Sequence, residues 1–325
     1  MKLLTYKINN IKTHQIGVLK DDLVFNLNNF FGDIGLVDLI QLEDYQSKIN
    51  DVISEKHNDK HELSNITLLP PIPKPNSFRD AYAFRQHVET CRKNRGAEMI
   101  KEFDEFPVFY FSNHNSMFAD KDDIELMPDH FEKLDFELEF AVVIGKKGKN
   151  ILSKNADNYI AGFCILNDIS ARGLQSEEMK LNLGPAKGKD FANVIGPYLV
   201  TPDELKHKEI HTPFGKKYDL EMQCFVNGDL ISSGNAKDMS WTFAEIIERA
   251  SYGVELYPGD IIGSGTVGRG CFLEINGTKK RNDKNYVEKW LRQGDIIKME
   301  IESIGNISNK IVKSNNDHSI QKLKK

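Results

Sequence analysis

Four of the chain's eleven prolines fall within six residues, at Pro70, Pro71, Pro73 and Pro75. Proline lacks a backbone N–H and restricts the residue before it, so this stretch predicts an extended connector. A chain of 325 residues also exceeds one average domain. We therefore expect a small N-terminal domain over residues 1–70, a larger domain over 71–312 and a polar, flexible tail over 313–325.

Composition and charge exclude several classes of protein. The chain has 40% hydrophobic and 28% charged residues, with a net charge of −5, and it has no basic block outside its last residues, which argues against a nucleic-acid partner. No apolar run is long enough to cross a membrane, and the apolar run at the start is too short for a signal peptide. The cysteines are scattered with no Cys-x-x-Cys pair, so we expect reduced thiols, no disulfide framework, no zinc site and a cytoplasmic location.

Local patterns predict the main elements. Alternating phrases predict short strands at 1–8, 13–20 and 23–29, and apolar residues at helical spacing predict one amphipathic helix over 36–53. Residues 136–145 and 159–167 predict buried strands. There is no regular alternation of strands with long helices, which argues against a doubly wound parallel sheet.

Two short phrases carry specific local predictions. Asn227-Gly228 lies between two apolar runs and predicts a two-residue hairpin. Thr242 and Glu245 have the spacing of a capping box that opens a helix, with Phe243 and Ile246 on its inner face.

The phrase LDFELEF contains a pair of carboxylates. Glu137 and Glu139 are two residues apart, so in a strand both would point to the same side, with α-carbons about 6.5 Å apart. Two carboxylates at this separation can converge on one hard cation. The alternative is a half-buried strand with a solvated acidic face.

Further polar residues stand near predicted strand ends. Asp168 follows a buried run, and Arg172 and Gln175 follow within two helical turns, which fits either an oxyanion site or a simple turn. Asp80 and His87 are seven apart and would share a face if their segment were helical. Histidine is the first candidate for a general base, although a lone histidine is more often packed or solvated.

The phrase GSGTVGRG contains a formal GxGxxG motif at Gly263, Gly265 and Gly268. The next phrase, CFLEI, predicts a strand that Glu274 closes, so no helix N-terminus would be available for a pyrophosphate. We therefore expect no nucleotide cofactor, and interpret the glycines as a turn that approaches a ligand closely. The chain has no GxSxG, Walker A, HExxH or EF-hand phrase.

Seven phrases between about residues 78 and 312, taken together in this order and spacing, resemble the fumarylacetoacetate hydrolase family. They are RDAYAFRQH, FPVFYFSN, LDFELEFAVVIG, NDISARGLQ, LGPAKGKDF, PGDIIGSGTVG and CFLEI. The resemblance implies an α+β fold, a mixed β-roll with few helices preceded by a small N-terminal α/β domain, and usually a homodimer.

The same resemblance implies roles for individual residues. The acidic side chains that would hold a divalent cation, Mg²⁺ or Ca²⁺ with Mn²⁺ possible, are Asp80, Glu137, Glu139 and Asp168. The general base would be His87, oriented by Glu274, and the groups that stabilise the oxyanion would be Arg172, Gln175 and Lys189. The substrate contacts would be Tyr82, Tyr110 and Thr266.

The reaction implied is metal-dependent hydrolysis of a C–C bond in a 1,3-dicarbonyl acid, resembling fumarylacetoacetate or an acylpyruvate, as in aromatic amino acid catabolism. Alternatives on the same metal site are oxaloacetate decarboxylation and 2-hydroxypenta-2,4-dienoate hydration, and an alternative of another class is a metal-stabilised scaffold without catalysis. A substrate-contacting tyrosine of the family, a few residues after Gln175, is replaced here, and Met179 is the residue nearest to its position. The loop from Gln175 to Lys189 is one residue longer than in the animal enzyme of the family. Both departures leave the identity of the diketo acid open.

Overall fold

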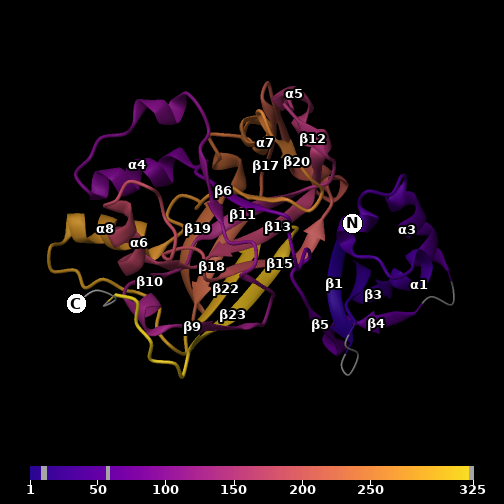
Figure 1. Cartoon of the computed structure of the whole chain (residues 1–325), viewed down its shortest axis with the longest axis horizontal. Helices are drawn as coiled ribbons and strands as arrows, with labels where there is room; N and C mark the ends of the chain where they lie inside the picture. Colours follow the sequence, from indigo (N-terminus) through magenta and orange to yellow (C-terminus); the bar gives the residue numbers. More distant parts are fainter. Residues whose placement is uncertain (9–12, 56–58, 322–325) are drawn as a thin grey trace.

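The computed structural model describes residues 1–8, 13–55 and 59–321, and mixed β-sheets dominate it (Figure 1). Within these residues the largest sheet has 12 strands. In spatial order its main path is β4 (Lys60–Glu62), β3 (Leu23–Asn26), β2 (Gln15–Lys20), β1 (Lys2–Ile8), β15 (Asn193–Val200), β13 (Ile160–Asp168), β11 (Leu138–Ile144), β21 (Ile261–Gly263), β6 (Phe78–Ala81) and β7 (Phe109–Ser112), with β5 (Ile66–Leu68) on β1 and β8 (Met117–Phe118) on β15.

A second sheet packs against the first. Its strands in spatial order are β19 (Asp229–Asn235), β18 (Glu221–Val226), β22 (Ile296–Ile301), β23 (Gly305–Lys313) and β9 (Asp123–Leu126). Short two-stranded pairs are β10 (Leu134–Asp135) with β14 (Ser170–Ala171), β12 (Gly148–Lys149) with β20 (Glu255–Leu256), and β16 (Glu209–Thr212) with β17 (Gly215–Tyr218).

Short helices lie between the strands. The α-helices are α1 (Asn28–Phe31), α2 (Leu36–Leu39), α3 (Tyr45–Ser54), α4 (Arg85–Asn94), α5 (Ser153–Ala156), α6 (Arg172–Met179), α7 (Phe243–Ser251) and α8 (Phe272–Asn282). The 3₁₀ turns are η1 (Leu63–Asn65), η2 (Lys101–Asp104), η3 (Pro128–Phe131), η4 (Asp157–Tyr159), η5 (Pro202–Lys208) and η6 (Ala236–Asp238). Among the helices of the described ranges, none combines the length and the apolar character that a membrane crossing requires.

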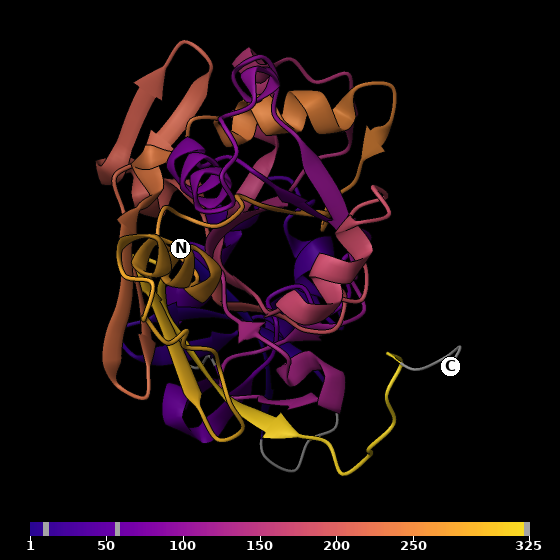
Figure 2. The same ribbon diagram turned by 90° about the vertical axis from the view of Figure 1, so that its left-hand side faces the viewer.

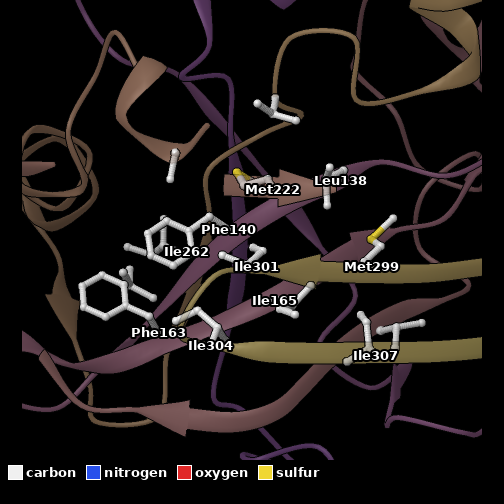
Figure 3. Packing of buried hydrophobic residues seen from close by; sticks show 14 of the residues in the cluster. Leu138, Phe140, Phe163, Ile165, Met222, Ile262, Met299, Ile301, Ile304 and Ile307 are labelled. Carbon is white, nitrogen blue, oxygen red and sulfur yellow. The ribbon is translucent and has the colours of Figure 1, made fainter. Parts of the chain in front are cut away.

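The central strands β11, β13 and β15 are buried on both faces. On one face Phe140 stacks on Phe163 with ring centroids 5.0 Å apart. In Figure 3 these rings lie in one apolar cluster with Met222 of β18 and Ile301 of β22, from the second sheet. The core therefore lies between two packed sheets, and the predicted α+β class is confirmed.

The N-terminal segment covers the other face of the central strands. Cys164 and Leu166 belong to a second hydrophobic cluster together with Leu3 and Ile49. Strand β1 pairs antiparallel with β15, with Lys2 opposite Val200, so the sheet continues from one predicted domain into the other (Figure 1). The boundary at residue 70 stays a prediction from the proline run.

Two local predictions are confirmed. Asn227 and Gly228 form the turn between β18 and β19, and both have positive φ, as this hairpin type requires. Thr242 caps α7: its hydroxyl accepts the N–H of Glu245, and the Glu245 carboxylate accepts the Thr242 N–H in return.

Two other local predictions are wrong. The single helix expected over 36–53 is two helices, α2 and α3, and Asp44 between them has a left-handed backbone with φ 56°. The phrase at 271–275 is not a strand, because α8 begins at Phe272. A short apolar run does not distinguish a strand from a buried helix start.

The C-terminal segment beyond β23 has no helix or strand in its described part, residues 314–321. Its residues nevertheless form hydrogen bonds with the rest of the protein. Ser314 N donates to Leu126 O at 2.9 Å, and Ser319 Oγ and Ile320 N donate to the Asp129 carboxylate at 2.8 and 2.7 Å. The flexible tail over 313–325 stays a prediction. Residues 322–325, which complete the predicted tail, lie outside the described residues.

A buried histidine within η3, His130, predicts a pH dependence of stability. Burial, together with the charge of Lys187, lowers the pKa of His130 from 6.5 to about 4, and the ring stacks on Phe191 at 4.0 Å. Between pH 6.5 and about 4 the unfolded chain binds a proton at residue 130 that the folded chain does not bind. His130 therefore lowers the free energy of unfolding as pH falls, by at most about 1.4 kcal/mol per pH unit. We expect His130→Phe to lose this part of the slope in denaturant titrations from pH 7 to 4. Equal slopes in the two proteins would contradict the prediction.

Candidate active site

Four acidic side chains converge in the middle of the large sheet. Asp80 lies in β6, Glu139 in β11 and Asp168 at the end of β13, while Glu137 directly precedes β11. These strands are close neighbours in the sheet, joined through β21. One carboxylate oxygen from each residue lies within 4.8 Å of the others, and all four side chains are buried. We call this group the acidic cluster. Because it is buried, the alternative of a solvated acidic face is wrong.

The glycines of the GxGxxG motif make room for the acidic cluster. A Cβ at Gly263 would overlap Asp80 Oδ1 and come within 3.1 Å of Glu139 Oε2. Gly265, with φ 77°, donates its N–H to the same two oxygens at 3.2 Å each. The backbone here therefore approaches carboxylates closely, which only residues without a side chain allow.

The reason given above for excluding a nucleotide at this motif is also wrong, because a helix does follow it. However, the first amides of α8 already have a partner: Phe272 N and Leu273 N donate to the buried carboxylate of Asp135 at 2.7 and 3.0 Å. A pyrophosphate would have to displace that carboxylate. The absence of a nucleotide cofactor stays a prediction, now based on this occupied helix end.

The pKa values of the acidic cluster reflect burial of like charges. Burial raises the pKa of Asp80 to about 7, with a further contribution from Asp168. Burial and the neighbouring carboxylates raise the pKa of Glu139 well above its ordinary value, and burial also raises that of Asp168. Glu137 differs: burial favours its neutral form, but Lys189 and Arg172 outweigh burial and lower its pKa.

Two buried cations partly compensate the acidic cluster. Lys189 Nζ donates to Glu137 Oε2 and, at 2.6 Å, to Asp168 Oδ2. Arg172 Nη2 contacts Glu137 Oε1 at 2.7 Å, and its Nη1 donates to Gln175 Oε1 at 3.0 Å. The three predicted oxyanion groups therefore do lie together beside the predicted metal ligands.

The acidic cluster suits a hard divalent cation. Glu139 Oε1 and Asp168 Oδ1 are buried and have no hydrogen-bond partner among the residues that the structure describes. Buried carboxylate oxygens without partners are costly, and a cation would satisfy them. A donor set made only of oxygens is the chemistry that Mg²⁺, Ca²⁺ and Mn²⁺ prefer. Asp80, Glu137, Glu139 and Asp168 would therefore hold the ion.

His87 does not share an element with Asp80, because Asp80 lies in β6 and His87 in α4, so the condition for a common helix face is not met. His87 is buried and its Nδ1 lies 2.7 Å from Glu274 Oε2 in α8, as the resemblance implied. Burial lowers the pKa of His87, whereas Cys91 and Glu274 raise it, with a net rise from 6.5 to about 10. A ring nitrogen of His87 and an oxygen of Glu137 lie within 4.8 Å, so the pair adjoins the acidic cluster.

The predicted substrate contacts surround the same region. Tyr110 O–H donates to Asp168 Oδ2 at 2.6 Å. The ring of Tyr82 lies edge-on to His87 with centroids 6.0 Å apart. Thr266 is buried in the loop that follows β21.

Sequence analysis missed three residues of this region. Asp135 is fully buried, accepts from Arg172 Nε at 2.9 Å and caps α8. The sequence pattern could have identified Asp135, because it alternates with Glu137 and Glu139 in the phrase LDFELEF. The others are Cys91 and Cys271, whose sulfurs each lie within 4.8 Å of a His87 ring nitrogen.

Removing one charge of the acidic cluster should separate cation binding from folding. We expect Glu139→Gln to weaken Mg²⁺ binding about tenfold or more, because a charged ligand is lost. Without a cation the same variant should melt at a higher temperature than the wild type, because the neutral amide removes the cost of burying or protonating a carboxyl group whose pKa is raised well above its ordinary value. Calorimetry and thermal melts with chelator check the two parts, with Glu125→Gln on the exposed side of β9 as the control. Unchanged Mg²⁺ affinity in Glu139→Gln would contradict the metal site.

Comparisons with known proteins agree with this geometry. The model of the fumarylacetoacetate hydrolase C-terminal domain matches residues 76–312. An uncharacterized protein of Staphylococcus epidermidis is 30% identical over 332 residues, covering 97% of this chain and all of the relative. Another, from Staphylococcus aureus, is 30% identical over 331 residues, covering 96% of this chain and all of the relative.

Solved structures have the same fold along nearly the whole chain. Each of three covers 97% of this chain and is itself covered completely. A fumarylacetoacetate hydrolase from Exiguobacterium antarcticum has a TM-score of 0.72 at 24% identity, and a probable 2-hydroxyhepta-2,4-diene-1,7-dioate isomerase from Mycobacterium abscessus has 0.71 at 25%. A maleylpyruvate hydrolase from Sphingobium, in complex with manganese(II) and pyruvate, has 0.71 at 20%. With the family model spanning most of the sequence, the chain belongs to the fumarylacetoacetate hydrolase family.

Proposed function

We propose that the protein is a divalent-cation-dependent hydrolase that cleaves a C–C bond in a 1,3-dicarbonyl acid. The observation that carries the proposal is the buried His87–Glu274 pair, which adjoins the acidic cluster. A cation site alone would stabilise the enolate of several reactions, including oxaloacetate decarboxylation and 2-hydroxypenta-2,4-dienoate hydration. A positioned base next to it adds the means to activate water.

His87 is the residue that takes the proton. Its Nδ1 is held by Glu274 at 2.7 Å, so Nε2 is the nitrogen that would accept a proton from water. Glu274 Oε2 also accepts the N–H of Arg269 at 2.8 Å, which fixes the carboxylate. When bound, a divalent cation would polarise the carbonyl groups of the substrate and, as a nearby positive charge, favour the neutral imidazole that a general base needs.

Lys189, Arg172 and Gln175 would stabilise the oxyanion. A lysine ammonium has three N–H donors, and Glu137 and Asp168 take two of those on Lys189, so one remains for substrate. Preorganised donors in a buried site stabilise developing charge more than water does. Tyr82, Tyr110 and Thr266 would contact the rest of the substrate.

The chemistry of the bond explains why a dicarbonyl acid is proposed. Attack of water on one carbonyl lets the adjacent carbon leave as an enolate, which a lone ketone does not allow. The maleylpyruvate hydrolase structure, with manganese(II) and pyruvate, supports a diketo acid as substrate and a divalent cation as cofactor. For this cation we propose Mg²⁺, Ca²⁺ or Mn²⁺. The isomerase neighbour supports other enolate reactions. Decarboxylation needs no activated water, so the His87–Glu274 pair favours hydrolysis over decarboxylation.

The substrate class is tested with a panel. Purified protein with Mg²⁺ should consume an acylpyruvate or fumarylacetoacetate, followed as loss of diketone absorbance, and should leave oxaloacetate largely unchanged. Chelator should abolish the activity. Faster turnover of oxaloacetate than of any diketone would favour the decarboxylase. The homodimer and the cytoplasmic location stay predictions from resemblance and sequence.

The role of His87 is tested by substitution. We expect His87→Ala to lower kcat roughly 10²–10⁴-fold, the usual contribution of a positioned base, while Mg²⁺ affinity stays near that of the wild type. Glu274→Gln should give a comparable loss, and the double variant should be little worse than either single one, because the pair acts as a unit. His211→Ala, at an exposed position of β16, is the matched control. Fully additive losses, or retained turnover in His87→Ala, would contradict water activation.

The pH profile gives an independent check. Wild-type kcat/KM should rise with pH as His87 loses its proton, through an apparent pKa below the value of about 10 that the ring has without a cation. His87→Ala should lack this rise. If kcat/KM rose in the same way in both proteins, the group that titrates would not be His87.

A further inference from the structure

One carboxylate outside the acidic cluster accepts three consecutive backbone N–H groups. It belongs to Glu178, in the last turn of α6. The three donors are Ala186 N at 2.9 Å, Lys187 N at 2.6 Å and Gly188 N at 3.1 Å. Successive backbone amides that point to one place form a concave site for an anion. Here the chain supplies that anion itself, and we call the arrangement the Glu178 clamp.

The Glu178 clamp adjoins Lys189, one of the proposed oxyanion groups. Lys189 directly follows Gly188, and its own N–H donates to Ala186 O at 3.0 Å, which closes a turn on the clamped residues. The ammonium of Lys189 is buried and donates to Glu137 and Asp168. The carboxylate of Glu178 therefore holds the backbone from which this side chain enters the acidic cluster.

Gly188 docks the same loop on α6 at a second place. A Cβ at Gly188 would lie 2.6 Å from Gln175 Cβ and 2.7 Å from Gln175 N, so only glycine fits here. Gly188 O also accepts the N–H of Ala171, just before α6, at 2.9 Å. Because α6 carries Arg172 and Gln175, the loop is fixed to the helix that supplies the two other oxyanion groups.

The chain between Glu178 and the clamped amides is exposed. Leu181 and Leu183 are 81% and 94% exposed, so apolar packing does not anchor this stretch. The returning end of the loop is held instead by the Glu178 clamp and by Gly188. Stretches with few buried apolar contacts open most easily, so loss of the clamp would free the backbone next to Lys189.

The clamp lies on a different part of the scaffold from the proposed base. Figure 2 shows the pink α6 apart from the gold α8 and the purple α4, the helices that carry Glu274 and His87. α6 packs against η3, β10 and β14. A change at Glu178 can therefore disturb Lys189 while the His87–Glu274 pair stays in place.

We propose that Glu178 is a positioning residue, which clamps the loop of Lys189 to α6 and so fixes the Lys189 ammonium relative to Arg172 and Gln175. Donors stabilise a developing oxyanion because they are held in place beforehand. A displacement of about 1 Å can lower a rate roughly 10²-fold. The effect on rate rests on the proposed function, whereas the placement of Lys189 does not.

Acetylation of lysines tests the placement of Lys189 without any turnover. The full-length protein, saturated with Mg²⁺, is treated with an activated ester of acetic acid, and mass spectrometry measures the rate at each lysine. Buried Lys189 should react slowly in the wild type and about tenfold faster or more in Glu178→Ala, because the freed loop opens. Lys284, which is exposed, is the reference. Equal rates at Lys189 in the two proteins overturn the proposal.

Kinetics test the consequence for catalysis. Glu178→Ala should lower kcat about 10²-fold with little change in KM, and Glu178→Gln, which keeps one accepting oxygen, should lose less. Glu177→Gln is the matched control, because this neighbouring carboxylate of α6 pairs with exposed Lys180 at 2.7 Å. If Glu178→Ala is as active as the control, the kinetic part is overturned.

A double-mutant cycle distinguishes positioning of Lys189 from a general structural role. In Lys189→Met, which lacks the ammonium, Glu178→Ala should cause little further loss of kcat, since Glu178 acts through that group. A further loss as large as in the wild-type background would show that Glu178 acts elsewhere and overturns the proposal. If no diketo acid is turned over, the proposed function fails, while the acetylation rates, which need neither turnover nor Lys189→Met, still decide the placement.

Discussion

Four buried carboxyl groups lie close together, and the rest of the candidate active site is arranged around the cost of burying them. Each buried charge is unfavourable unless opposite charge or hydrogen-bond donors surround it. Lys189 and Arg172 supply positive charge, and the N–H of Gly265 adds a donor. Within the described part of the chain, Glu139 Oε1 and Asp168 Oδ1 still have no hydrogen-bond partner. The remaining deficit is the driving force for taking up a cation.

Features set by neighbouring residues could be read from the sequence. The hairpin at Asn227-Gly228 and the cap at Thr242 follow from turn geometry and one side-chain hydrogen bond, so the residue types suffice. The α+β class and the family were predictable because several phrases occur in a fixed order, and the family model confirms it. The family resemblance carried by this order also implied which acidic residues come together.

Features set by distant partners could not be read in this way. The phrase after Gly268 is a helix because the carboxylate of Asp135 accepts its first two amides, and the local pattern contains no trace of that partner. Asp80 and His87 are separated by a strand end, which periodicity alone did not reveal. Cys91 and Cys271 both lie near His87 because α4 packs on α8. Long-range packing, rather than propensity, decided each case.

The cap that Asp135 provides also bears on how the site comes into being. Its carboxylate joins Arg172, 37 residues away, to Phe272, 137 residues away, and the His87–Glu274 bond spans 187 residues. Closing loops of this size costs chain entropy before any contact repays it. No fragment of the chain can therefore hold the proposed catalytic groups in register. Their arrangement is a property of the finished topology, and we expect a nascent or partly unfolded chain to be inactive even though it carries all of these side chains.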